Sequence, residues 1–123
     1  MKKGLLVKRS EDNKSLELSL VEIDEDASEL HQIYNHLGVE LIDVVNYKNK
    51  SIYVDDEGLL KPDPQLTMFL NDTNQDLYGN LLIMGDVDDE GETLGISSSD
   101  ADSVLSEFEV VKDMLTEQEY LLW

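Results

Sequence analysis

The alternation of apolar and polar positions divides the chain into short elements around one buried segment, residues 80–84. Its four large apolar residues, Leu81 to Met84, lie between Gly79-Asn80 and Gly85. Such a run is too short for an independent helix and is typical of a strand buried on both faces. The run leads directly into an acidic loop, residues 86–92. The pattern therefore predicts that residues 80–84 occupy the centre of a sheet.

The N-terminal residues 4–9 and 15–23 have the pattern of two strands joined by the polar turn 10–14. In the second of them Leu16, Leu18 and Leu20 share one face, and Glu17, Ser19 and Val21 share the other. This alternation predicts a half-buried strand.

A helix is predicted over residues 27–37. Its apolar residues Leu30, Ile33, Tyr34 and Leu37 recur at helical spacing, and Gly38 follows as a left-handed C-terminal cap. The acidic cluster 24–26 precedes the helix, where negative charge is favoured by the exposed N–H groups.

The middle of the chain is predicted to form a hairpin, followed by a turn, a short strand and a brief helix. Residues 39–47 and 51–54 read as paired strands. A turn at 55–58 and a short strand at 59–61 follow. Residues 65–71 are then expected to form a brief helix, with Asp63 as its N-cap, Pro64 at its first position and apolar side chains facing inward.

The C-terminal segment 98–123 is expected to be helical. Ser99 and Asp102 are spaced as a capping pair, and the apolar residues that follow are Val104, Leu105, Phe108, Val111 and Leu115. Thr116 with Glu119 predicts a restart that carries Tyr120, Leu121, Leu122 and Trp123. These last four side chains either pack back on the sheet or form a contact surface for a partner.

Together these elements predict an α+β fold, a mostly antiparallel sheet of about five strands with two main helices packed on it. The 123 residues are expected to form a single domain, 1–123, with an N-terminal hairpin at 3–23 and the C-terminal helical segment. A chain of this length buries roughly two-thirds of its unfolded surface, so its core needs no covalent staple.

The amino-acid composition excludes several kinds of functional site. The chain has no cysteine, which excludes disulfides, zinc-thiolate sites and thiol nucleophiles. No export signal and no membrane-spanning run is recognisable, so we expect the protein in the bacterial cytoplasm.

Charge is distributed unevenly. The chain holds nine basic and 28 acidic residues, a net charge of −19, and residues 16–123 alone hold four bases and 26 acids. Such a body repels nucleic acids and anionic membranes and is drawn towards basic surfaces. Solubility alone is the alternative explanation for the charge.

Several short motifs resemble the phage-associated domain-of-unknown-function family 3846 over about residues 28–97. They are carried, in order, by residues 36–45, 52–60, 76–85 and 89–92, with a proline between the second and the third. The resemblance implies a gene of phages and mobile elements, with no assigned catalytic residues.

The sequence predicts neither an enzyme nor a cofactor. It contains no Walker loop, dinucleotide fingerprint or nucleophile elbow. Asp86, Asp88 and Glu90, followed by Gly91, partly match a calcium loop, but the position that requires a bidentate glutamate is Ser97. We therefore expect no metal here, and these three residues are only weak candidates.

Three functions remain. In the first, the protein inhibits a basic host defence protein, such as a restriction or CRISPR nuclease, by presenting carboxylates where DNA phosphates would bind. Residues 86–123 carry twelve acids and one base, Lys112, and the predicted contact residues are Asp86, Asp88, Asp89, Glu90, Glu92, Asp100, Asp102, Glu107 and Glu109, the last four on the following helix.

The second function is binding of a small molecule or nucleotide signal in a pocket lined by Tyr34, Tyr47, Tyr53 and Tyr78. The third is a phage assembly subunit that forms a homodimer through Leu121, Leu122 and Trp123.

Overall fold

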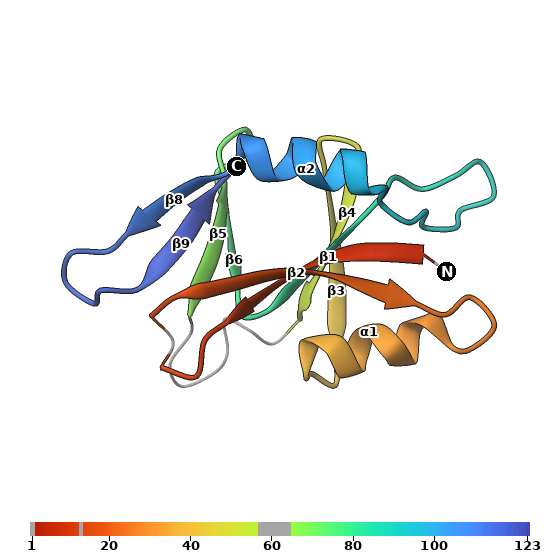
Figure 1. Ribbon diagram of the computed structural model, residues 1–123, viewed down its shortest axis with the longest axis horizontal. Helices are drawn as coiled ribbons and strands as arrows, with labels where there is room; N and C mark the ends of the chain where they lie inside the picture. The colour runs from red at the N-terminus through yellow and green to blue at the C-terminus, as the bar shows by residue number, and fades with distance from the viewer. Residues whose placement is uncertain (1, 13, 57–64) are drawn as a thin grey trace.

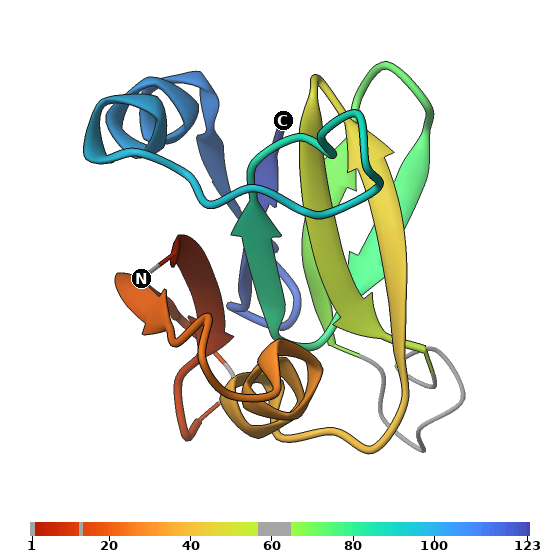
Figure 2. The same cartoon turned by 90° about the vertical axis from the view of Figure 1, so that its right-hand side faces the viewer.

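The computed structural model describes residues 2–12, 14–56 and 65–123. Nine strands and two helices occur within these ranges, arranged as two sheets flanked by helices (Figures 1 and 2). In chain order they are β1 (Lys2–Arg9), β2 (Leu16–Ile23), α1 (Glu29–Leu37), β3 (Ile42–Tyr47), β4 (Lys50–Asp55), β5 (Leu66–Leu70), β6 (Gln75–Tyr78), β7 (Leu81–Met84), α2 (Ser98–Glu107), β8 (Glu109–Lys112) and β9 (Glu119–Leu122).

The first sheet is antiparallel throughout, with strand order β2-β1-β7-β4-β3. Strand β7 occupies its centre, and all four β7 side chains are buried. Ile83 lies between Leu5 of β1 and Ile52 of β4. The predicted central strand is therefore confirmed, as is the antiparallel sheet of five strands.

The two faces of this sheet support separate apolar clusters, because successive side chains of a strand point to opposite faces. Leu82 belongs to a cluster with Ile33 and Leu37 of α1. Ile83 belongs to a larger cluster with Ala101 and Val104 of α2 and with residues of the second sheet. Figure 1 accordingly shows α1 and α2 on opposite sides of β1. Neither helix is long and apolar enough to cross a membrane.

The second sheet, with strand order β6-β5-β9-β8, was not expected from the sequence. The helix predicted at 65–71 is wrong, because β5 lies there and bonds to β6 on one side and to β9 in parallel on the other. Its predicted cap, Asp63, lies outside the described residues, as does the short strand at 59–61.

The helical segment predicted at 98–123 is correct only as far as Glu107. Phe108 turns the backbone to an extended conformation, and residues 109–112 and 119–122 form the hairpin β8–β9. Leu115, one of the apolar residues of the predicted helix, is 96% exposed at the tip of this hairpin. β-branched Val110 and Val111 favour the strand over the helix there.

The turns and caps agree more closely with their predictions. Gly38 has φ 69° and ψ 36°, the predicted left-handed cap, while Ser28 caps the other end of α1. Leu30, the first residue of the predicted apolar face of this helix, is exposed. The β3–β4 hairpin is present with a two-residue turn, Lys48-Asn49, in which both residues have positive φ.

The N-cap of helix α2 is Ser97, two residues before the predicted cap Ser99, and substitution of the two serines tests this assignment. The Ser97 side chain accepts a hydrogen bond from the backbone N–H of Asp100 at 3.0 Å, whereas Ser99 lies inside the helix. We expect Ser97→Ala to lower the free energy of unfolding by about 1 kcal/mol. Ser99→Ala should change it by less than about 0.5 kcal/mol. Urea unfolding measures both, and equal losses would contradict this cap assignment.

Candidate functional site

The acidic loop 86–92 leaves the end of β7 as a small ordered hairpin. Val87 and Thr93 form an antiparallel bridge, and the Leu94 N–H donates to the Asp86 carbonyl at 2.9 Å. The Asp88 N–H donates to the Glu92 carbonyl at 2.8 Å. Figure 1 shows this segment extending beyond the N-terminal end of α2. Its exposure agrees with the prediction for the loop.

The five acids of the loop have different roles. Asp88 is half-buried, and its Oδ1 accepts hydrogen bonds from the N–H groups of Glu90 and Glu92, both at 2.9 Å. Asp86, Asp89, Glu90 and Glu92 are exposed. Asp88 therefore folds the loop, and the other four carboxylates face water.

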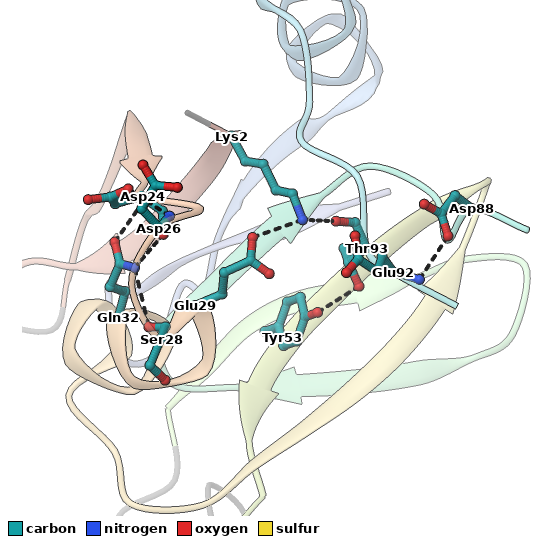
Figure 3. Close-up of polar contacts among 10 residues, drawn as sticks. All are labelled: Lys2, Asp24, Asp26, Ser28, Glu29, Gln32, Tyr53, Asp88, Glu92 and Thr93. Atoms are coloured by element: carbon teal, nitrogen blue, oxygen red, sulfur yellow. Dashed lines mark hydrogen bonds and ion pairs between the residues drawn. The ribbon is translucent and has the colours of Figure 1, made fainter. Parts of the chain in front are cut away.

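Lys2 ties this loop to the rest of the fold (Figure 3). Its Nζ lies 2.8 Å from Glu29 Oε1 on α1 and donates to the Thr93 carbonyl at 2.8 Å. The hydrogen bond to Glu29 raises the pKa of Lys2 and outweighs the opposing effect of burial. The Tyr53 hydroxyl lies 2.8 Å from Thr93 Oγ1. These contacts hold the acidic loop against β1, β4 and α1.

Sequence reasoning did not identify Lys2 or Thr93 as part of this region. The two residues are 91 positions apart, and no motif links them. A pocket of about 420 Å³ lies beside Lys2, lined by Glu25, Ala27, Ser28, Glu29, Leu30 and Glu92.

The four predicted contact residues beyond the loop are dispersed. Asp100 and Asp102 are exposed near the start of α2. Glu107 is the last residue of α2 and pairs with Lys48 at 3.7 Å. Glu109 begins β8 and is not on the helix, which corrects its predicted position. Because β8 lies beyond the other end of α2 (Figure 1), these acids span the length of the helix.

Exposed carboxylates also lie elsewhere on the molecule. Glu17 and Glu22 are exposed on β2, Glu25 and Asp26 after it, and Asp43 on β3. The predicted contact residues are therefore one part of a wider acidic surface. The loop backbone is fixed by the hydrogen bonds to Asp88 and by the contacts of Lys2 and Tyr53 with Thr93. Carboxylate bonds to the backbone also occur at Asp113, in the β8–β9 hairpin.

No group of three or more acidic or histidine side chains in the described residues is arranged to hold a metal ion. The weak candidates Asp86, Asp88 and Glu90 do not form such a group. The hydrogen bonds to Asp88 Oδ1 account for this in part, because they turn that carboxylate towards the loop backbone.

The tyrosines proposed as a pocket lining do not share one site. Tyr47 and Tyr53 belong to the clusters on opposite faces of the first sheet. The Tyr47 hydroxyl donates to the Trp123 carbonyl at 2.8 Å, whereas the Tyr53 hydroxyl contacts Thr93. These two side chains therefore have structural partners in separate parts of the fold.

The apolar C-terminal residues pack back on the fold, which was one of the two predicted outcomes. Leu121 and Trp123 are buried and Leu122 is half-buried. A homodimer contact through Leu121 or Trp123 would require these side chains to leave the core.

Comparison with known proteins gives one match. The family model described as "Domain of unknown function (DUF3846)" matches residues 3–109, a range that includes the motifs at 28–97. No curated protein and no solved structure matches the chain.

Proposed function

The chain belongs to the domain-of-unknown-function family DUF3846, whose description assigns no activity, and we propose its function from its surface chemistry. The protein acts as an acidic inhibitor that occupies the nucleic-acid groove of a basic host protein. The targets that fit are nucleases of restriction or CRISPR systems of the host of a phage or mobile element. No catalytic step is part of this proposal.

The observation that supports it most is the fixed loop 86–92. Four exposed carboxylates are carried on a backbone that Asp88 and Lys2 hold in one conformation. An ordered loop loses little conformational entropy on binding, so its charges can match the spacing of lysine and arginine side chains at low cost. Asp100 and Asp102 extend the same charge along the start of α2.

The net charge of −19 supplies the long-range part of recognition. Charge of one sign steers a protein towards an oppositely charged groove and raises the association rate, and this effect falls with increasing salt. Binding would release the anions that the basic groove holds, as DNA does. Affinity should therefore fall steeply as salt concentration rises.

The test is competition with labelled duplex DNA for purified restriction and CRISPR nucleases, chosen after low-salt capture from a bacterial lysate. Asp89→Lys combined with Glu90→Lys should weaken the inhibitor at least about tenfold, because both charges lie at the loop tip. Asp88 is left unchanged, since its replacement would unfold the loop. The thermal midpoint of the variant should stay close to that of the wild type.

The matched control is Asp72→Lys combined with Asp76→Lys, which changes the net charge equally at two exposed positions of the second sheet, one in the turn after β5 and one on β6. This control should lose only the long-range attraction, about twofold in affinity. Equal losses in the two double variants would show that total charge, and not the loop, determines binding. No displacement of DNA from any of these nucleases would contradict the proposed function.

A further inference from the structure

Strand β2 forms one edge of the first sheet (orange in Figure 2). It pairs with β1 along its whole length, from Leu16 to Ile23, and no other described strand pairs with it. The Ser10 N–H donates to the Ser15 carbonyl at 2.9 Å, and this contact sets the phase of the ladder. Backbone groups in an antiparallel ladder alternate in direction, so those of Leu18, Leu20 and Glu22 point away from β1.

Natural proteins usually protect such edges with short strands, prolines, bulges or charged side chains. On the opposite edge strand, β3, Asp43 Oδ1 accepts from the Val44 N–H at 2.9 Å, which occupies one backbone donor of that edge. The edge strands β6 and β8 have four residues each. Strand β2 has eight residues and no proline. It is therefore the longest edge strand in the described part of the chain.

The side chains of β2 are self-complementary around Ser19. Leu18 and Leu20 face the same side as the buried Leu5 and Val7, yet they are 37% and 45% exposed. They remain exposed because no further strand lies beside them in the described ranges 2–12, 14–56 and 65–123.

We propose that a second copy of this chain pairs antiparallel with β2 through residues 17–21, with Ser19 opposite Ser19. In this register Leu18 faces Leu20 of the second copy and Glu17 faces Val21, so the four leucines form one apolar cluster. No like charges lie directly opposite each other. Lys14 precedes β2, where its Nζ lies 3.4 Å from Glu117 of the same chain, and Glu22 lies near the other end of the strand. Antiparallel pairing brings the base of each copy towards the acid of the other.

The backbone supports the same register. Leu18 and Leu20 of each copy present the outward N–H and C=O groups, so each Leu18–Leu20 pair exchanges two hydrogen bonds. Pairing confined to residues 17–21 leaves intact the bond from the Leu16 N–H to Glu119 Oε1, at 3.3 Å. The five-stranded sheets of the two copies would join into one continuous sheet across the two-fold axis.

Charge gives this dimer a distinctive salt dependence. Each copy carries −19, so self-association is opposed by repulsion that salt screens. The dimer should therefore become tighter as salt rises. The proposed binding of a basic protein should instead become weaker as salt rises. Because the two salt dependences are opposite, each proposal can be rejected without rejecting the other.

The test uses the absence of native cysteine. Ser19→Cys creates one thiol per chain, and a non-hydrogen-bonded antiparallel pair holds the two Cα atoms about 4.5 Å apart, within the range of a disulfide. Under mild oxidation we expect Ser19→Cys to form a covalent dimer at least about tenfold faster than Ser103→Cys, an exposed position on α2. Equal rates would overturn the proposal.

Sedimentation velocity of the wild-type protein, which has no cysteine, provides the second measurement. We expect a dimer whose population grows with salt up to about 0.5 M. Leu18→Lys should make the protein monomeric and leave its circular dichroism unchanged, whereas Leu105→Lys, at an exposed α2 position, should leave the dimer intact. A wild-type monomer at all salt concentrations, or a dimer that survives Leu18→Lys, would overturn the proposal.

Discussion

Trp123→Ala should lower the free energy of unfolding by about 3–5 kcal/mol, the range for deleting a large buried aromatic side chain. The Trp123 side chain is 3% exposed, and its ring meets Tyr47 and Phe108 edge-on, with centroids 5.2 Å and 5.3 Å away. Its backbone N–H donates to the Phe69 carbonyl at 3.0 Å. The substitution removes the side-chain contacts and keeps the backbone bond.

Urea unfolding followed by circular dichroism measures this loss. Met114→Ala is the matched control, because Met114 is 94% exposed at the tip of the β8–β9 hairpin. We expect the control to change stability by less than about 0.5 kcal/mol. If Trp123→Ala and Met114→Ala behaved alike, the C-terminal residue would not be part of the core.

The same packing changes how a truncation should be interpreted. Removing the chain after Thr116 deletes β9, which lies between β5 and β8 in the second sheet. Such a variant would lose the pairing partners of both neighbouring strands as well as Leu121 and Trp123 from the core. A loss of self-association on truncation would therefore reflect unfolding of the second sheet. Point substitutions on β2 avoid this problem.

Local patterns predicted the elements whose signals lie within a few residues. Strand β7 was predictable because four large apolar residues stand between glycines, and the β3–β4 hairpin because two apolar runs flank a polar turn. Gly38 marked the end of α1 for a conformational reason, since a left-handed backbone favours glycine.

The second sheet was not predictable in this way. Residues 65–71 have apolar positions that suit a short helix, and pairing with β6 on one side and with β9, about fifty residues away, on the other makes them a strand. Likewise Val104 and Leu105 belong to a helix, whereas Val110 and Val111 a few residues later belong to a strand. Short apolar runs do not distinguish helix from strand, and long-range pairing decides between them.

For the candidate site, the sequence predicted the exposure of the loop but not what fixes it. Charge density in 86–92 indicates a solvent-facing segment, because unpaired carboxylates are costly to bury. It does not reveal that Asp88 is turned inward to bond the backbone, or that Lys2 anchors Thr93. These contacts depend on the packing of β1 and α1 beside the loop.

Arg9→Met should lower the free energy of unfolding by about 2–4 kcal/mol, because it leaves two main-chain carbonyls without their donor. Arg9 is 8% exposed, and its Nη1 donates to the Leu66 carbonyl at 2.7 Å and to the Glu119 carbonyl at 3.2 Å. Arg9 thus joins β1 of the first sheet to β5 and β9 of the second. Burial lowers the pKa of Arg9, although an arginine begins so high that it stays charged.

The control is Lys8→Met, which removes one positive charge from the neighbouring exposed position and should change stability by less than about 0.5 kcal/mol. Methionine keeps most of the aliphatic volume of arginine, and Lys8→Met matches the change in net charge, so the difference between the two variants reports the loss of the polar contacts of the guanidinium group. Because Arg9 does not titrate between pH 5 and 9, that difference should be constant across this range. Replacing a buried charge by an apolar side chain is sometimes neutral. A neutral Arg9→Met would mean that water or relaxation of the backbone satisfies the two carbonyls, and that apolar packing and the remaining hydrogen bonds, such as Tyr47 to Trp123, hold the sheets together.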